Sequence, residues 1–459
     1  MASTLLLMPA NMTYKTSTFT TDPSLQRVRS FTKMPLVDNN KRTITFEVVA
    51  PPRVCDASNN KIVEKKKCTR LSRLWKKIQG QNNWENLVQP LDPLLRAEII
   101  RYGEFVAACY KAFDLDPSSK RYLNCKYGRK NMLREVGLEN CGYEVTKYIY
   151  ATPDINLNIP MRNGGEGKWI GYVAVSDNET CKKIGRRDIL ISFRGTITNH
   201  EWIANLMSSL TPARLDPHNT RDEIQVEAGF LSLYTSNESD NKFGLESCRE
   251  QLLSEVSRLL NKFKGEEISI TLAGHSMGSS LALLLGYDLA ELGLNRKIIS
   301  NCNKFEEKIP ITVFSFGGPR VGNSGFKERC EELGVKVLRI VNEKDPITKL
   351  PGVFLNKDFE VKFGILGGRY EFSWSFSCYD HVGVEVLLDF FKMENPCCVH
   401  DLDSYIINLL KCSSSRQFPS GGVDFLKKVK EFVQSRRVHL NNLPWKDVAL
   451  NMMNLVQSQ

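Results

Sequence analysis

The stretch ISITLAGHSMGSSLALLLG, residues 268–286, decides the fold of this chain. Its first part, residues 268–272, alternates apolar and polar positions as a β-strand does, and its last part is an apolar run that is typical of a buried helix. Between them, Gly274 and Gly278 leave room for a tight reversal of the backbone. The stretch therefore predicts a strand, a sharp turn with Ser276 at its apex, and a helix.

The segments around this unit alternate in the same way. Strand signals at 189–193, 268–272, 309–316 and 335–341 are interleaved with helix signals at 247–263 and 277–292. This order predicts the α/β class, with a mostly parallel central sheet flanked by helices. Apolar residues at helical spacing also predict a helix over 92–113, with Pro93 in its first turn and its apolar face in the core.

Ser276 is the candidate nucleophile. A tight strand-to-helix turn holds the apical residue in a strained conformation and presents its hydroxyl at the N-terminus of a helix, where developing negative charge is favoured. The alternative is a structural turn that happens to contain a serine. The strand before Ser276 and the helix after it favour the catalytic interpretation.

A nucleophilic serine needs a base and an acid, which follow it in this type of fold in the order acid, then histidine. Asp345 comes just beyond a strand that ends at Val341 and directly before Pro346. Ligands of open α/β sheets bind at the carboxyl ends of strands, so Asp345 is the candidate acid. An ordinary Asp-Pro turn is the alternative.

Three histidines follow Ser276 and could supply the base. His400 lies in a turn before a short apolar helix, and His381 lies at the head of an apparent core segment. Loop placement favours His400, although the residue types alone leave His381 open. His439 lies in a basic C-terminal segment and is expected at the surface.

The reaction also needs donors for an oxyanion. The backbone N–H groups of Met277, directly after the nucleophile, and of Thr196, after the strand 189–193, are the candidates. Residues 200–210 then place Trp202, Ile203 and Leu206, with Met207 and Leu210, on one helical face. We expect this helix to be a lid that opens on lipid, with a core helix as the alternative.

The composition excludes some classes of protein. With 42% hydrophobic and 25% charged residues, the chain is close to an ordinary globular protein, and no apolar run approaches the ~18 residues of a membrane span. Much of the net charge of +10 comes from residues 53–77, which hold nine Lys or Arg and two acids. This local segment does not indicate nucleic acid, and we expect a solvated tail or a contact with anionic lipid.

The cysteines and the N-terminus indicate the compartment. Thirteen scattered cysteines suggest free thiols under reducing conditions, with neither a disulfide framework nor a zinc site. Residues 1–21 hold eight Ser or Thr and no acid, as organelle transit peptides do, and their apolar run is short for a secretory signal. We expect residues 1–60 to be a transit peptide and basic linker outside the fold.

Seven motifs give the chain a family resemblance. They are FRGT (193–196), EWIANL (201–206), VEAGFLSLY (226–234), GHSMGSSLA (274–282), FSFGGPRVGN (314–323), NEKDPI (342–347) and VHDLDSYI (399–406). With them, the chain resembles class 3 lipases over about 75–412, which leaves 413–459 as an expected helical extension. The segment NNWENLVQPLDPLLRAEIIRYGEF looks more specifically like plant class I phospholipase A1 enzymes of the plastid.

The resemblance implies an α/β-hydrolase fold with a helical lid, and hydrolysis of the sn-1 acyl ester of phospholipids and galactolipids without a metal or cofactor. It implies a plastid protein that is soluble or peripheral at a lipid surface. By the same resemblance Ser276, Asp345 and His400 form the triad, Thr196 and Met277 supply the oxyanion donors, and His381 is structural.

Other functions stay open at this point. A triacylglycerol lipase or a soluble esterase would carry the same triad, and a soluble esterase would show no rate increase when its substrate aggregates. A lipase-like signalling adaptor without catalysis is a further alternative. Such adaptors usually append a large helical domain, whereas only 59 residues follow His400.

Overall fold

The computed structural model describes residues 69–151, 168–196, 209–237, 246–297, 307–351, 379–393 and 395–411. All of these residues belong to one compact unit. The predicted transit peptide and linker, the lid residues Trp202, Ile203 and Leu206, and the C-terminal extension lie outside the described residues.

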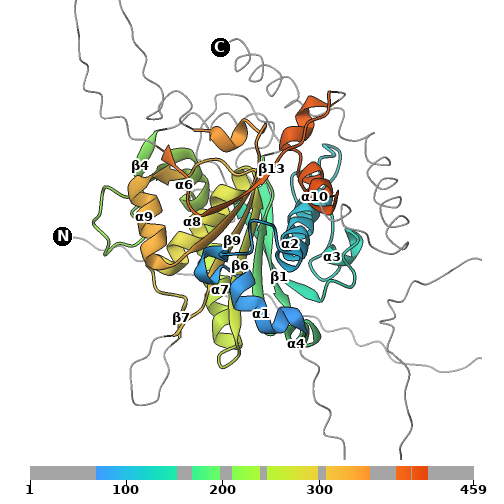
Figure 1. Cartoon of the computed structure of the whole chain (residues 1–459), viewed down its shortest axis with the longest axis horizontal. Helices are drawn as coiled ribbons and strands as arrows, with labels where there is room; N and C mark the ends of the chain where they lie inside the picture. Colours follow the sequence, from blue (N-terminus) through green and yellow to red (C-terminus); the bar gives the residue numbers. More distant parts are fainter. Residues whose placement is uncertain are drawn as a thin grey trace, which may run out of the picture. The chain divides into compact units, whose positions relative to one another are not determined.

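The described helices alternate with strands along the chain (Figure 1). The α-helices are α1 (Arg70–Ile78), α2 (Pro93–Ala112), α3 (Met132–Glu135), α4 (Asn178–Ile184), α6 (Ala228–Thr235), α7 (Cys248–Lys262), α8 (Met277–Glu291), α9 (Ser324–Leu333) and α10 (Leu402–Lys411). Short 3-10 helices are η1 (Gln81–Trp84), η2 (Ile347–Lys349) and η3 (Pro396–His400).

The described strands form one large sheet and two small ones. Strands of the large sheet are β1 (Tyr143–Ala151), β2 (Lys168–Ser176), β3 (Arg187–Phe193), β6 (Ile268–His275), β9 (Ile311–Phe316), β11 (Lys336–Asn342) and β13 (Val384–Leu388). The others are β4 (Leu210–Pro212), β5 (Gln225–Glu227), β7 (Arg296–Lys297), β8 (Glu307–Lys308), β10 (Gly322–Asn323) and β12 (Tyr379–Asp380).

The large sheet is mostly parallel, as predicted. Its order is β1-β2-β3-β6-β9-β11-β13. Neighbouring strands from β3 to β13 pair in parallel, and β2 pairs antiparallel with both β1 and β3. In register, Phe193 faces Gly274 and His275 faces Phe316. The carboxyl ends of β3, β6 and β9 therefore lie side by side at one edge of the sheet.

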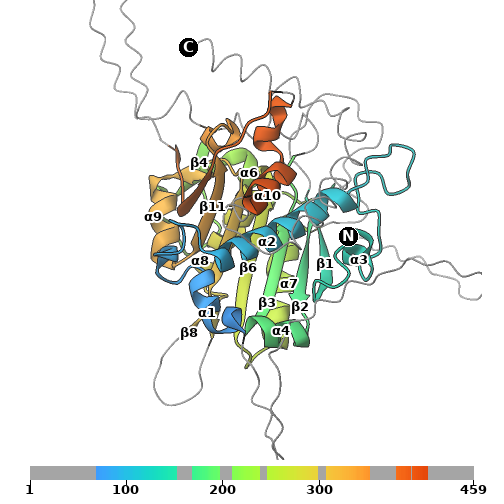
Figure 2. The ribbon, with the colours of Figure 1, turned by 45° about the vertical axis from the view of Figure 1, so that its right-hand side comes forward.

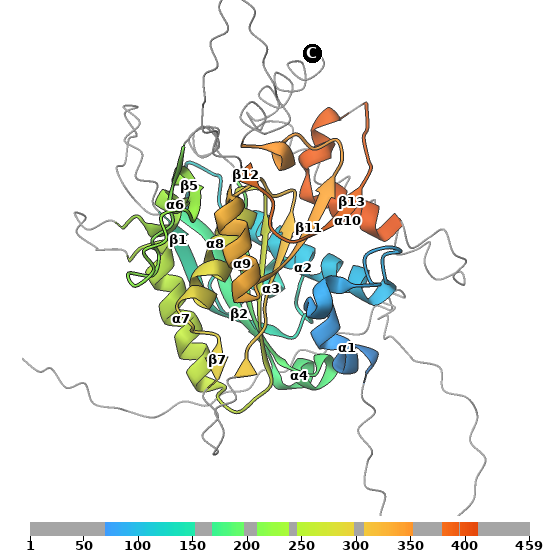
Figure 3. The same ribbon diagram turned by 60° about the vertical axis from the view of Figure 1, so that its left-hand side comes forward.

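Helices cover both faces of the sheet and give two apolar cores. Helices α7, α8 and α9 lie on one face (Figure 3), and α2 runs across the other face together with α10 (Figure 2). Every residue of β3, β6 and β9 is buried, because both faces of these central strands are packed. Among the described residues, no helix combines the length and apolar character needed to span a membrane.

The predicted helix over 92–113 is confirmed as α2. Pro93 is its first residue, where the missing N–H of proline removes no helical hydrogen bond. The Asp92 carboxylate caps it by accepting from the N–H groups of Leu94 at 2.7 Å and Leu95 at 3.2 Å. Helix α1 begins earlier, at Arg70, so the end of the basic segment is ordered and buries Trp75.

One element differs from the prediction. Leu210, expected on the helical lid face, is instead the first residue of β4 and pairs with Glu227 of β5. This strand ends at Pro212 and lies at the edge of a four-stranded sheet, where a proline is tolerated because no ladder donor is needed on the outer side. Strand pairing has therefore overridden the helical spacing at this position.

Candidate active site

Ser276 lies at the apex of the turn between β6 and α8. Its backbone has φ 56° and ψ −129°, in the left-handed half of conformational space that a side chain disfavours. Its N–H donates to the Phe316 carbonyl at 2.9 Å, which ties the turn to the neighbouring strand β9. A Cβ at Gly274 would lie 2.2 Å from the Gly278 carbonyl oxygen, so the predicted spacing of glycines is required by the tightness of the turn.

His400 connects the serine to an acid. The Ser276 hydroxyl lies 2.9 Å from His400 Nε2, and His400 Nδ1 lies 2.7 Å from Asp345 Oδ2. Because a carboxylate only accepts, Nδ1–H donates to Asp345 and Nε2 is left to accept from the serine. The structure thus brings together three residues that are up to 124 positions apart in the sequence.

Asp345 is fully buried and held by three donors. Besides His400, the Tyr405 hydroxyl donates to Oδ2 at 2.7 Å and the Ile347 N–H donates to Oδ1 at 2.9 Å. Burial, followed by the charge of Asp345, raises the pKa of Tyr405 well above its usual value, so its hydroxyl keeps its proton. The sequence reasoning missed the role of Tyr405, although the VHDLDSYI motif contains it.

His381, the alternative base, has another set of contacts. Its Nε2 lies 2.8 Å from the Thr348 carbonyl oxygen, to which it donates. Burial, with the positive charges of Arg339 and Arg320, lowers the pKa of His381 to about 3. A neutral histidine that bonds the backbone in this way holds η2, which contains Thr348, to the segment between β12 and β13.

The two candidate oxyanion donors lie at the same edge. Thr196 follows β3, Met277 is the first residue of α8, and the Thr196 hydroxyl donates to the Met277 sulfur at 3.4 Å. The N–H groups of a first helical turn point toward the helix N-terminus, on the side where Ser276 lies.

The sequence also gave no sign that Asp401, next to His400, supports the site. Its carboxylate caps α10 by accepting from the Ser404 N–H at 2.9 Å and the Ser404 hydroxyl at 2.8 Å. Burial, with Asp403 as the next cause, raises the pKa of Asp401 to about 6. The cap fixes the start of the helix that carries Tyr405.

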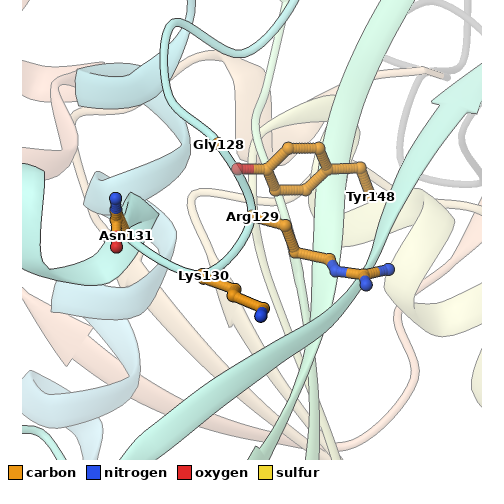
Figure 4. Close-up of a pocket in the computed structure, with 5 residues that line it drawn as sticks. All are labelled: Gly128, Arg129, Lys130, Asn131 and Tyr148. Carbon is orange, nitrogen blue, oxygen red and sulfur yellow. The ribbon is translucent and has the colours of Figure 1, made fainter. Parts of the chain in front are cut away.

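A hollow elsewhere on the described surface differs from this site. It has a volume of about 450 Å³ and is lined by Gly128, Arg129, Lys130, Asn131 and Tyr148 (Figure 4). None of the predicted site residues lines it. Within the described ranges, no group of three or more His, Cys, Asp or Glu is arranged to hold a metal ion.

Comparisons with known proteins agree with the fold and the motifs. The family model described as Lipase (class 3) matches residues 190–355, which include Ser276 and Asp345. The chloroplastic galactolipase DONGLE of Arabidopsis thaliana is 63% identical over 370 residues, which cover 80% of this chain and 76% of that protein.

Two further relatives carry phospholipase names. The chloroplastic phospholipase A1-Ialpha2 of Arabidopsis thaliana is 65% identical over 340 residues, covering 73% of this chain and 68% of the relative. Phospholipase A1 EG1, chloroplastic/mitochondrial, of Oryza sativa subsp. indica is 54% identical over 403 residues, covering 86% and 88%. The chain therefore belongs to the class 3 lipase family of carboxylic ester hydrolases, in the group that contains these plant phospholipase A1 and galactolipase enzymes.

Proposed function

We propose that this protein hydrolyses the sn-1 acyl ester of phospholipids and galactolipids, with Ser276, His400 and Asp345 as its catalytic triad. The observation that carries the proposal is the continuous hydrogen-bonded chain from the Ser276 hydroxyl through His400 to the buried Asp345 carboxylate. The names of the relatives support the substrate class, since they include both a galactolipase and phospholipases A1.

The reaction is acyl transfer through the serine. His400 Nε2 takes the hydroxyl proton as Ser276 Oγ attacks the ester carbonyl carbon, and Asp345 stabilises the imidazolium that forms. The tetrahedral intermediate collapses, the C–O bond to glycerol breaks, and His400 gives its proton to the departing lysolipid alcohol. A water molecule, deprotonated by His400, then attacks the acyl-enzyme and releases a free fatty acid and the restored serine.

The backbone N–H groups of Thr196 and Met277 are proposed to donate to the oxyanion of both tetrahedral intermediates. Thr196 follows β3, and Met277 follows Ser276 at the end of β6, the parallel strand next to β3. Donors held rigidly by a fold need no reorganisation as the charge develops, and the loss of one such donor typically lowers kcat by about 10²- to 10³-fold.

We further propose that the enzyme works at the surface of plastid membranes. Diacyl lipids are presented in membranes or aggregates, so a peripheral association with such a surface gives access to them. The chloroplastic names of the relatives and the Ser/Thr-rich, acid-free composition of residues 1–21 support the plastid location. The lid proposed at Trp202, Ile203 and Leu206 stays a prediction.

The test is fatty acid release from micelles of phosphatidylcholine and of monogalactosyldiacylglycerol. Each lipid carries palmitate at sn-1 and linoleate at sn-2, so the fatty acid released identifies the position cleaved. We expect palmitate from both lipids, and a loss on the order of 10⁶-fold in kcat for Ser276→Ala.

Ser280→Ala is the matched control. Ser280 is a fully buried serine of α8, the helix that follows Ser276, and its hydroxyl has no hydrogen-bond partner in the described part of the chain. The control should keep the parent rate. Release of linoleate would refute sn-1 specificity, and release from neither lipid by the folded parent enzyme would refute the proposed function.

A further inference from the structure

A chain of hydrogen bonds links the candidate oxyanion loop to the candidate base. The Gly195 N–H donates to the Tyr110 hydroxyl oxygen at 2.7 Å, and the same hydroxyl lies 2.7 Å from His275 Nδ1. On the other side of its ring, His275 Nε2 lies 3.0 Å from the carbonyl oxygen of His400. Tyr110 lies on α2 and His275 ends β6. These two side chains therefore join α2, the Gly195 loop, the end of β6 and the backbone of His400.

The direction of each bond in this chain follows from its ends. A carbonyl oxygen only accepts, so His275 Nε2 carries a hydrogen. Burial, with His400 as the next cause, lowers the pKa of His275 well below its usual value, so the ring is neutral and Nδ1 is unprotonated. Tyr110 must therefore donate to Nδ1 while it accepts from Gly195, which leaves one consistent arrangement of protons.

Arg194 fixes the next peptide group of the same loop. This fully buried side chain donates from Nη1 to the Gly195 carbonyl oxygen at 2.9 Å and from Nε to the Trp169 carbonyl oxygen at 2.9 Å. In a planar trans peptide the C=O and the following N–H point in opposite directions. By holding the Gly195 carbonyl, Arg194 sets the direction of the Thr196 N–H.

The packing around Gly195 allows little movement. A Cβ at Gly195 would lie 2.5 Å from the Tyr110 hydroxyl, 2.7 Å from the His275 carbonyl oxygen and 2.9 Å from Ser276 Cβ. The loop is thus pressed between the tyrosine and the nucleophile turn. A shift of the Tyr110 hydroxyl would therefore displace the backbone of Gly195 and the peptide group that follows it.

We propose that Tyr110 and His275 are positioning residues that hold the Thr196 donor in register with Ser276 and with the backbone of His400. The inference rests on the proposed function, because it assigns a task in the same hydrolysis. Neither side chain contacts the substrate in this role. Their effect is expected on the stabilisation of the transition state, and therefore on kcat more than on KM.

The experiment compares Tyr110→Phe with Tyr172→Phe in the full-length protein, using a soluble p-nitrophenyl ester. Both changes remove one tyrosine hydroxyl, from half-buried Tyr110 on α2 or from buried Tyr172 on β2. The Tyr172 hydroxyl donates to the Phe105 carbonyl at 2.9 Å and lies outside the Gly195 chain. We expect Tyr110→Phe to lower kcat by about 10- to 100-fold with KM within about twofold, since the donor is displaced rather than removed. Tyr172→Phe should leave both constants near those of the parent enzyme.

A second variant, His275→Gln, tests the other half of the chain. It should lower kcat similarly and leave the midpoint of the kcat/KM pH profile unchanged, because His275 stays neutral throughout. A shifted midpoint would make His275 a titrating group and overturn its positioning role. Equal kcat for Tyr110→Phe and Tyr172→Phe would overturn this inference alone. Failure of the folded parent enzyme to release fatty acid from either lipid would overturn the proposed function itself.

Discussion

Asp188, inside β3, and Asp345, in the turn that follows β11, are two carboxylates that have no exposed surface. Asp188 accepts hydrogen bonds from four hydroxyl groups, at 2.6–2.9 Å, which belong to Tyr102, Tyr143, Ser269 and Thr271. Burial raises the pKa of Asp188, but Arg186 and Arg101 outweigh this effect and hold it below its usual value. Every partner of Asp188 in this set is an internal group that packs α2 against the sheet.

Asp345 has a similar number of donors, but one of them connects it to the candidate nucleophile. One of its donors, His400, is 17% exposed and passes the contact on to Ser276. The two sites teach that burial and saturation of a carboxylate do not by themselves mark catalysis. The hydrogen bonds of Asp188 lead only to other groups inside the protein, whereas those of Asp345 lead through His400 to the Ser276 hydroxyl at the carboxyl ends of the strands.

The largest effect is expected from Asp345→Asn. The amide preserves the shape but has one acceptor oxygen where the carboxylate has two, so it cannot accept from the Ile347 N–H at one position and from His400 Nδ1–H and the Tyr405 hydroxyl at the other. By analogy with the same change in other triads, kcat should fall by about 10⁴-fold while Tm changes little. Ester hydrolysis and a thermal melt on the same sample check this, and a variant that unfolds without a specific loss of kcat would place Asp345 in the class of Asp188.

Asp188→Asn should show the opposite pattern. It removes the negative charge that acts on buried Arg186 and on half-buried Arg101, and leaving a buried charge uncompensated typically costs about 3–5 kcal/mol. Urea unfolding should reveal this loss of stability, while kcat per folded molecule, counted by titration of the active serine, stays within about twofold of the parent. A 100-fold fall in kcat of the folded fraction would break the comparison.

Asp401 sharpens the comparison with a smaller effect that depends on pH. Its folded pKa of about 6 lies above the ordinary value of 3.8, so its contribution to stability is fully present below pH 3.8 and is lost as the pH rises through 6. Asp188, with its lowered pKa, has the opposite sign and loses its contribution as the pH falls below 3.8.

The variant Asp401→Asn stays neutral and can still accept from Ser404. Its Tm relative to the parent protein should therefore rise between pH 4 and pH 7.5, by a few degrees at most. Thermal melts at several pH values in this window measure the difference. A difference that stays flat or falls would show that the burial of Asp401 carries no penalty for its charge.

Much of the fold and the nucleophile could be predicted because local sequence sets them. The glycine spacing around Ser276 follows from steric limits within five residues, and Asp345 follows from the end of an apolar strand. The base was harder, because residue types alone left His381 and His400 open. Which histidine folds back onto the serine depends on a contact across 124 positions.

The supporting residues could not be predicted for the same reason. Helical periodicity correctly placed the apolar face of α2 against the sheet, but it does not show that Tyr110 on this helix meets the N–H of Gly195. Asp188 stands inside a strand of otherwise ordinary composition, and its four hydroxyl partners come from α2, β1 and β6. Partners of buried polar groups are chosen by tertiary packing, which leaves no local pattern.

The backbone conformation of Ser276 has a consequence for how such a protein changes over generations. A side chain at φ 56° strains the fold by about 1–3 kcal/mol, and only selection for chemistry maintains it. A glycine at this position would relax the turn and remove the hydroxyl in one step, with the rest of the sheet untouched. In duplicated copies of such a gene, the reaction is therefore lost first and the architecture last.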